Sequence, residues 1–321
     1  MISVIIPAYN AEKTIRRCLD SVVSQSVAAE IILADDGSED ATASAAGEYG
    51  DRVRLLALPH GGVSAARNAG LAAAKGDWVL FLDADDVLQP DALEKLSQGM
   101  SRDVDAVCGA VSRGNEKNRS RGKARSFPAG HALMDHVLAD PTDLLTIHAW
   151  AFRRREDMPV FDPALRIGED SDWVLRYLGA ARKAVFVPEN VYRYTVSDDS
   201  TVHKWREGQT GDYLKMLTKL SLGPAGAEKG WSAFVLTNYL LILTHVIFHP
   251  HNPGSRREQL KAARSLRDEP LIRAAFDSAD PGAVSMAKRI VLGCVKRDLM
   301  TPAYIAVKLR QKQNEKRAGE R

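Results

Sequence analysis

The sequence predicts an α/β protein with a mostly parallel sheet, followed by a helical C-terminal region. Two observations support this prediction. In the first 110 residues, short apolar runs typical of buried strands alternate with segments of helical pattern, and such alternation favours a parallel sheet with helices on both faces. Helical patterning then takes over near residue 208. We therefore expect a first domain over 1–207, made of the halves 1–110 and 111–207, and a helical domain over 208–321.

The expected elements follow one another closely at the start of the chain. The first strand starts at Ser3–Pro7, and Asn10 is a plausible cap for the helix behind it. The run 78–82 is short, apolar and preceded by Gly76, which is typical of a buried parallel strand. The complete set is strands at 3–7, 30–34, 53–58 and 78–82 and helices at 11–25 and 63–74.

The acidic tetrad Asp83-Ala84-Asp85-Asp86 follows the fourth expected strand directly. Open α/β sheets bind ligands at the carboxyl ends of their strands. Three carboxylates within four residues repel one another, so a divalent cation that joins them to a polyphosphate explains the group well. The alternative is a solvated loop before a helix at Pro90, and a lone D-x-D pattern fits both equally.

Four separated motifs occur in a fixed order, PAYN, ADDGS, GVSAARNAG and FLDADD. The expected sheet brings Tyr9, Asp36, Arg67 and the tetrad into one crevice. Over residues 2–96 this set resembles the nucleotide-binding half of family 2 glycosyltransferases, which have the fold called GT-A. The chain is most similar to the bacterial exopolysaccharide enzymes of the succinoglycan type.

The resemblance implies a donor site for a nucleoside diphosphate sugar, UDP-hexose, in 1–110 and an acceptor side in 111–207. Asp36 matches the aspartate that accepts a hydrogen bond from uracil, and Tyr9 offers a ring for the base to stack on. A core tyrosine is the alternative for Tyr9. The implied donor-binding residues are Pro7, Tyr9, Asp36, Arg67, Asp83, Ala84 and Asp85.

Roles of the charged residues also follow from the resemblance. Arg67 pairs with phosphate or the base edge in this view, and the alternative is an exposed helix arginine. Asp83 matches the position near ribose and sugar. Asp85 matches the ligand of Mn²⁺ or Mg²⁺, with Asp86 beside it. His203 falls where some relatives supply a further metal ligand, although a lone histidine is as often a plain surface or core residue.

A second acidic motif, Gly168-Glu169-Asp170-Ser171-Asp172, precedes an amphipathic segment. It resembles the family motif in which the aspartate after Glu is the general base of an inverting transfer, and Asp170 is that aspartate. A base is needed to remove the proton of the acceptor hydroxyl. Acidic residues in a first helical turn also satisfy free amides and the helix dipole, which is the alternative for Asp170.

Two other functions compete with the transfer of a sugar to a saccharide or lipid-linked saccharide. One is a sugar-nucleotide pyrophosphorylase, but no Gly-rich phosphate loop follows the first strand. The other is a non-catalytic nucleotide-sugar sensor or scaffold, against which the intact Asp85 and Asp170 argue. Release of nucleoside diphosphate under turnover distinguishes the scaffold from an enzyme.

Charge and cysteine usage bound the cellular setting. Residues 288–321 contain ten Lys and Arg against three Asp and Glu, in a chain of net charge +3. The basic excess lies away from the motifs, so we expect no nucleic-acid partner. No signal peptide precedes the first strand and the three cysteines lack metal spacing, so we expect a cytoplasmic protein.

The uncharged segment 231–249 has nearly the length of a membrane span. Asn238, Thr244 and His245 in it favour a helix buried in a helical bundle. A third possibility combines this segment with the basic tail. In it, the C-terminal helices lie on the anionic inner face of the membrane, where lipid-linked acceptors are found.

Overall fold

The computed structural model describes residues 1–114, 124–195, 205–227, 229–279 and 286–319. Two compact units divide it. The first comprises Met1–Met134 with Thr142–Ser197, and the second comprises Asp135–Pro141 with Asp198–Arg321. His203, which the sequence predicts as a metal ligand, lies outside the described residues. The division at residue 207 expected from the sequence stays a prediction.

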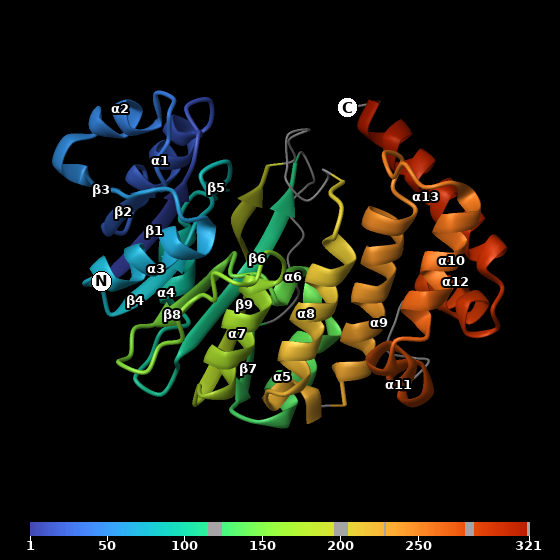
Figure 1. The fold of residues 1–321 in the computed structure, drawn as a ribbon. Coiled ribbons are helices and arrows are strands. Elements are labelled where there is room, and N and C mark those ends of the chain that lie inside the picture. The colour runs from blue at the N-terminus through green and yellow to red at the C-terminus, as the bar shows by residue number, and fades with distance from the viewer. Residues whose placement is uncertain (115–123, 196–204, 228, 280–285, 320–321) are drawn as a thin grey trace. The chain divides into compact units, whose positions relative to one another are not determined.

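A nine-stranded sheet of order β3-β2-β1-β4-β8-β6-β9-β5, with β7 beside β9, forms the centre of the first unit (Figure 1). Its strands are β1 Ile2–Ala8, β2 Ala29–Asp35, β3 Val53–Ala57, β4 Trp78–Phe81, β5 Val87–Leu88, β6 Ala106–Arg113, β7 Arg125–Pro128, β8 Trp150–Arg153 and β9 Lys183–Tyr194. The helices that precede α8 in the chain are α1 Ile15–Val23, α2 Thr42–Gly47, α3 Val63–Ala73, α4 Ala92–Ser97, α5 His131–Ala139, α6 Pro141–Leu144 and α7 Glu169–Gly179, with the 3₁₀ helix η1 Gly50–Arg52. The second unit includes the greater part of α5 and the first residue of α6.

The first four strands pair in parallel, as the alternation of strands and helices predicts. Beyond β4 the sheet is mixed, because β8 is antiparallel to both β4 and β6. One local expectation is wrong. Asn10 does not cap α1, which begins five residues later, but adopts a left-handed conformation and accepts a hydrogen bond from the amide of Glu39. Because β1 to β4 run parallel, their carboxyl ends share one edge of the sheet.

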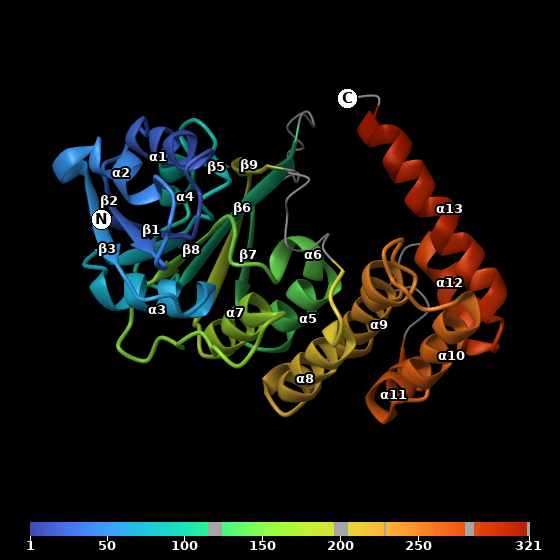
Figure 2. The same ribbon diagram turned by 45° about the horizontal axis from the view of Figure 1, so that its top comes forward.

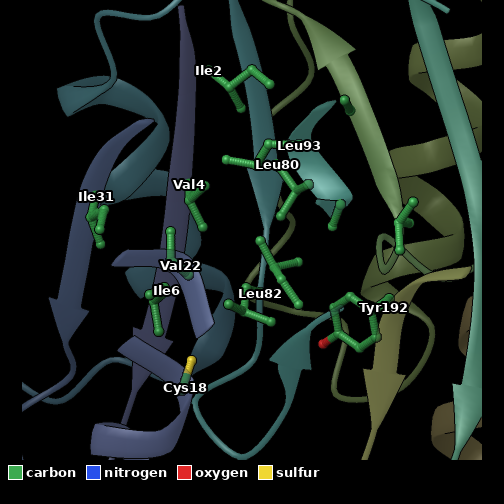
Figure 3. Close-up of a cluster of buried hydrophobic side chains, with 14 of the residues drawn as sticks. Ile2, Val4, Ile6, Cys18, Val22, Ile31, Leu80, Leu82, Leu93 and Tyr192 are labelled. Carbon is green, nitrogen blue, oxygen red and sulfur yellow. The ribbon is translucent and has the colours of Figure 1, made fainter. Parts of the chain in front are cut away.

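Alternating residues of β1 and β4 face a hydrophobic core beneath α1 and α4. Ile2, Val4 and Ile6 of β1 contribute to it, together with Leu80 and Leu82. Figure 3 shows them against Cys18 and Val22 of α1 and Leu93 of α4. Successive residues of a strand point to opposite faces, so alternate residues of β1 and β4 reach this core. The core fixes β4, and with it the start of the acidic tetrad.

The other face of the sheet is covered by α3 and α7. Gly70 of α3 lies so close to β1 that a Cβ there would be 2.3 Å from a methyl carbon of Ile5. Close approach of helix and strand therefore requires glycine at this position. Trp173 of α7 stacks on Phe161, with an interplanar angle of 10°, and meets Phe152 of β8 edge to face. These contacts hold the first turn of α7 near the sheet.

The second unit is helical (Figure 2). Its helices are α8 Gln209–Ser221, α9 Trp231–Ile242, α10 Arg256–Arg267, α11 Pro270–Ser278, α12 Met286–Lys296 and α13 Met300–Gly319, with the 3₁₀ helix η3 Pro224–Ala227 and the π-helix η4 Leu243–Ile247. Asn238 and Thr244 donate hydrogen bonds to backbone carbonyls four residues earlier. Among the described residues, no helix is long and apolar enough to cross a membrane.

Candidate active site

The loop between β3 and α3 is held by Asp36, which follows β2. Both oxygens of its buried carboxylate accept backbone hydrogen bonds, one from Gly61 and one from Gly62, each at 2.8 Å. Nδ1 of His60 lies 2.9 Å from the same carboxylate. A carboxylate oxygen can accept two hydrogen bonds, so Asp36 retains acceptor capacity for a ligand. These contacts fix the start of the helix that bears Arg67.

Tyr9, at the end of β1, is an exposed aromatic residue. Its side chain is 47% exposed, which excludes the alternative of a core tyrosine. Its ring lies against the imidazole of His60, with centroids 4.4 Å apart and planes inclined by 31°. Tyr9, His60 and Asp36 therefore form one local group. The sequence predicts two of its three members and misses His60, whose only signal is its place before Gly61-Gly62.

Arg67 joins parts of the chain that are about a hundred residues apart. Its Nη2 lies 3.1 Å from Asp83, and its Nη1 lies 3.0 Å from Glu169 and 2.7 Å from Asp170. Its Nε has no hydrogen-bond partner among the described residues. Burial lowers the pKa of Arg67, but the charges of Asp170, Asp83 and Glu169 outweigh burial and raise it. The alternative of an exposed helix arginine is excluded, because only 3% of Arg67 is exposed.

The first turn of α7 provides the acidic residues that meet Arg67. Burial and the charge of Asp170 raise the pKa of Glu169, and the charge of Arg67 opposes this effect. Asp172, one turn further, accepts hydrogen bonds from Arg176 in the same helix. Asp172 therefore stabilises the helix, whereas Glu169 and Asp170 face the arginine of α3.

Asp83 binds a second cation, His148, which precedes β8. Nε2 of His148 lies 2.8 Å from Asp83, on the carboxylate oxygen that Arg67 leaves free. Burial lowers the pKa of His148, but the charge and hydrogen bond of Asp83 outweigh it and raise this pKa to about 9. In the same way, His148 and Arg67 overcome the effect of burial and hold the pKa of Asp83 well below its usual range. Asp83 is thus an anion between two cations.

Asp85 and Asp86 are adjacent but differ in their burial and in their hydrogen-bond partners. Asp86 is buried and accepts hydrogen bonds from the Tyr192 hydroxyl and the Thr195 amide, both at 2.6 Å. Burial raises its pKa to about 7. Asp85 is half-buried and forms no ion pair with a described residue, while its backbone carbonyl accepts a hydrogen bond from Arg17. Burial and the charge of Asp83 raise the pKa of Asp85 as well.

Ligand atoms of Asp83, Asp86 and His148 all lie within 4.8 Å of one another, a grouping that could hold a metal ion. Much of its bonding capacity is already used, because Asp83 binds His148 and both Asp86 oxygens accept protein hydrogen bonds. Asp85 adds a carboxylate that forms no ion pair with a described residue. Several carboxylate oxygens at one strand end are the donors that Mn²⁺ and Mg²⁺ favour.

The remaining predicted donor residues are backbone positions near this edge. Pro7 lies in β1 opposite Ala34, and Ala84 is buried between the tetrad carboxylates. Two shallow cavities of about 380 and 410 Å³ open at the opposite, amino ends of the strands and include none of the predicted site residues. The predicted site residues therefore lie at the carboxyl edge of the sheet and outside these two cavities.

The chain is similar to known glycosyltransferases. Residues 3–158 match the model of glycosyl transferase family 2. The uncharacterized glycosyltransferase EpsJ of Bacillus subtilis is 28% identical over 291 residues, which cover 81% of this chain and 82% of that protein. The succinoglycan biosynthesis protein ExoO of Rhizobium meliloti is 32% identical over 216 residues, 62% of each chain.

Solved structures show a similar fold. The structure of S. aureus TarS 1-349 superposes with a TM-score of 0.67 over 97% of this chain and 91% of that one, at 19% identity. The same fragment has been solved in complex with UDP, with a TM-score of 0.62 at 18% identity. At these identities the likeness shows the fold alone.

Proposed function

Because the chain belongs to glycosyl transferase family 2 and has the GT-A fold, we propose that it transfers a hexose from UDP-hexose to a saccharide or lipid-linked saccharide. The predicted family, fold and glycosyltransferase activity are confirmed. The proposed reaction inverts the anomeric centre, uses a divalent cation and takes place in the cytoplasm, at the inner face of the membrane. Its products serve polysaccharide biosynthesis.

One observation is the main support for this reaction. Arg67 contacts both Asp83, at the carboxyl edge of β4, and Asp170, in the first turn of α7. The aspartate matched to the donor sugar and the aspartate matched to the general base are thus held by one side chain. A displacement at the anomeric carbon requires donor and base groups at the same place.

In the proposed mechanism, Asp170 accepts the proton of the acceptor hydroxyl as that oxygen attacks. Arg67 orients the Asp170 carboxylate, and Asp36 and Tyr9 hold the uracil by an accepted hydrogen bond and by stacking. In this proposal Arg67 also pairs with a phosphate or the base edge, because its planar group of donors suits anionic oxygens.

The residues present fit a bound divalent cation. Three carboxylates, Asp83, Asp85 and Asp86, lie within four residues, and Asp85 forms no ion pair with a described residue. Asp85 would hold Mn²⁺ or Mg²⁺, with Asp86 and His203 as further predicted ligands. When bound, the cation neutralises charge on the departing diphosphate. Asp86 would also stabilise the loop of the tetrad, because its carboxylate accepts hydrogen bonds from Tyr192 and Thr195.

A panel of nucleotide sugars tests the proposal. Thermal shift with Mn²⁺ or Mg²⁺ identifies the donor, because a ligand at 100 times its Kd stabilises the folded state by about 2.7 kcal/mol. Release of UDP in the presence of oligosaccharide or lipid-linked acceptors then measures transfer. Stabilisation by a GDP-sugar instead of any UDP-sugar would overturn the assigned nucleoside, and equal turnover with a chelator would overturn metal dependence.

A further inference from the structure

The last two helices of the second unit expose apolar side chains to an unusual extent. Of the ten large hydrophobic residues exposed among the described residues, Ile290, Leu299, Ile305 and Leu309 fall within twenty residues of one another. Ile305 and Leu309, 47% and 57% exposed, are spaced by four residues in α13 and so share one face. Burial of this face against a partner would remove apolar surface from water.

Positive charge accompanies these apolar residues. We call α12 and the first part of α13, residues 288–313, the basic hairpin. It contains seven Lys and Arg and a single acid, Asp298. Asp298 is already bonded to Arg264 and Arg267 of α10, so it does not neutralise the hairpin. Lys312 follows Leu309 by three residues and therefore shares the apolar face of α13.

Several cations of the hairpin form no ion pair within the part of the chain that the structure describes. Arg289, Arg310 and Lys312 are exposed and form no ion pair with any described residue. Burial and, to a smaller extent, the charge of Arg310 lower the pKa of Lys288, and the charge of Asp140 opposes them. Like charges held close together on two packed helices cost free energy that an external anion relieves.

We infer that the basic hairpin is the surface by which this chain docks on an anionic lipid bilayer. Ile305 and Leu309 insert at the level of the headgroups, while Arg289, Arg310 and Lys312 bind lipid phosphates. An exposed apolar stripe bordered by Lys and Arg is the pattern of a helix that lies in the membrane interface. The bilayer is favoured over a second copy of this chain, because two hairpins of the same charge repel each other.

This docking needs neither a nucleotide nor turnover, so it can fail or hold independently of the proposed reaction. It deepens that proposal in one respect, because it holds the enzyme at the surface where a lipid-linked acceptor is found. It also requires no membrane-spanning helix, in keeping with the described helices.

Sedimentation of the full chain with vesicles tests the inference. We expect the protein to sediment with phosphatidylcholine vesicles that contain phosphatidylglycerol, at low salt, and not with pure phosphatidylcholine vesicles. The triple variant Arg289→Gln, Arg310→Gln, Lys312→Gln should lower the partition constant roughly 100-fold, since each cation near an anionic surface contributes about 1 kcal/mol. A matched triple at exposed cations of the first unit, Arg52→Gln, Lys75→Gln, Arg102→Gln, should change it less than about threefold.

A second set of variants tests the exposed apolar side chains of the basic hairpin. Ile305→Ser with Leu309→Ser should leave the salt dependence of binding unchanged but weaken binding at every salt concentration. Leu222→Ser, at an exposed leucine in the same unit, should not. Circular dichroism confirms that each variant folds. Absence of sedimentation, equal binding by the charge variants, or dimerisation that the apolar variants abolish would each overturn the inference.

Discussion

Asp85 and Asp170 belong to one group of carboxylates but differ in their partners. Asp170 is bonded to Arg67, so the protein itself supplies its counter-ion. Asp85 forms no ion pair with a described residue, and burial and Asp83 raise its pKa. The difference suggests a division of work in which the tetrad leaves one carboxylate to an external cation, while α7 holds a carboxylate of fixed orientation.

Replacement of Asp85 should give the largest effect. Asp85→Asn removes a tetrad carboxylate that forms no ion pair with a described residue, so donor binding and transfer should fall together, with kcat/KM lower by at least about 10³-fold. The fold should persist, because Asp85 is half-buried and its backbone contact with Arg17 remains. Calorimetric titration of UDP with and without Mn²⁺, alongside the turnover assay, measures both quantities. A variant whose UDP affinity still rises with Mn²⁺ would show that Asp85 is not the ligand.

Replacement of Asp170 should separate binding from chemistry. Asp170→Asn keeps the size of the side chain and can still accept a hydrogen bond from Arg67, but it can no longer accept a proton. We expect kcat to fall by roughly 10²- to 10⁴-fold while the UDP-sugar affinity stays within about threefold of wild type. Single-turnover kinetics with a fixed acceptor provide the rate. Transfer at the wild-type rate would leave Asp170 with a helix-start role and make Glu169 the next candidate.

The separation of two partners along the chain decides whether their contact could be predicted from the sequence. The tetrad, Asp36 and Asp170 lie in short motifs beside strands and helices, so local pattern and resemblance locate them. The partners of Asp83 do not follow from local pattern, because His148 is 65 residues away and Glu169 and Asp170 meet it only through Arg67. Such pairings depend on the order of strands, in which β8 lies antiparallel beside β4.

The same dependence on distant contacts explains why the prediction for Asn10 is wrong and why His60 is missed. Asn10 has the side chain of a helix cap, yet it bonds to the loop after β2, which only the parallel pairing of β1 and β2 brings near. His60 has no periodic or charge pattern to mark it, and its roles depend on Tyr9 and Asp36 from two other strand ends.

The pH dependence of stability tests whether His148 is the cation that pairs with Asp83. The folded-state pKa of His148 is raised to about 9, above the usual value near 6.5. Its contribution to stability is therefore complete below pH 6.5 and is lost as pH rises through about 9. We expect wild type to exceed His148→Gln in free energy of unfolding by about 2 to 3 kcal/mol at pH 6, and the difference to vanish near pH 10.

Urea unfolding of both proteins across this range, with a chelator present, measures the difference. His251→Gln, at an exposed histidine of the second unit, is the control and should show no such pH dependence relative to wild type. A constant difference between wild type and His148→Gln from pH 6 to pH 10 would show that the His148–Asp83 pair is not ionic.

The smallest expected effect concerns Asp36, whose carboxylate accepts hydrogen bonds from the amides of Gly61 and Gly62 and lies 2.9 Å from Nδ1 of His60. If Asp36 also accepts a hydrogen bond from the uracil N–H, Asp36→Ala should weaken UDP binding by roughly 1.5 to 3 kcal/mol. The variant also frees the amides of Gly61 and Gly62, so part of any loss could come from the loop. Asp36→Asn addresses this, because its single carbonyl oxygen can hold one of these amides while the new amide group cannot accept from uracil.

Titration of each variant with UDP, UMP and ADP distinguishes an effect on the loop from a loss of base recognition. A loop effect should weaken all three ligands equally, whereas base recognition should reduce the preference for uridine over adenosine nucleotides. Unchanged UDP affinity in both variants would exclude the contact and leave Tyr9 and His60 as the groups that meet the base.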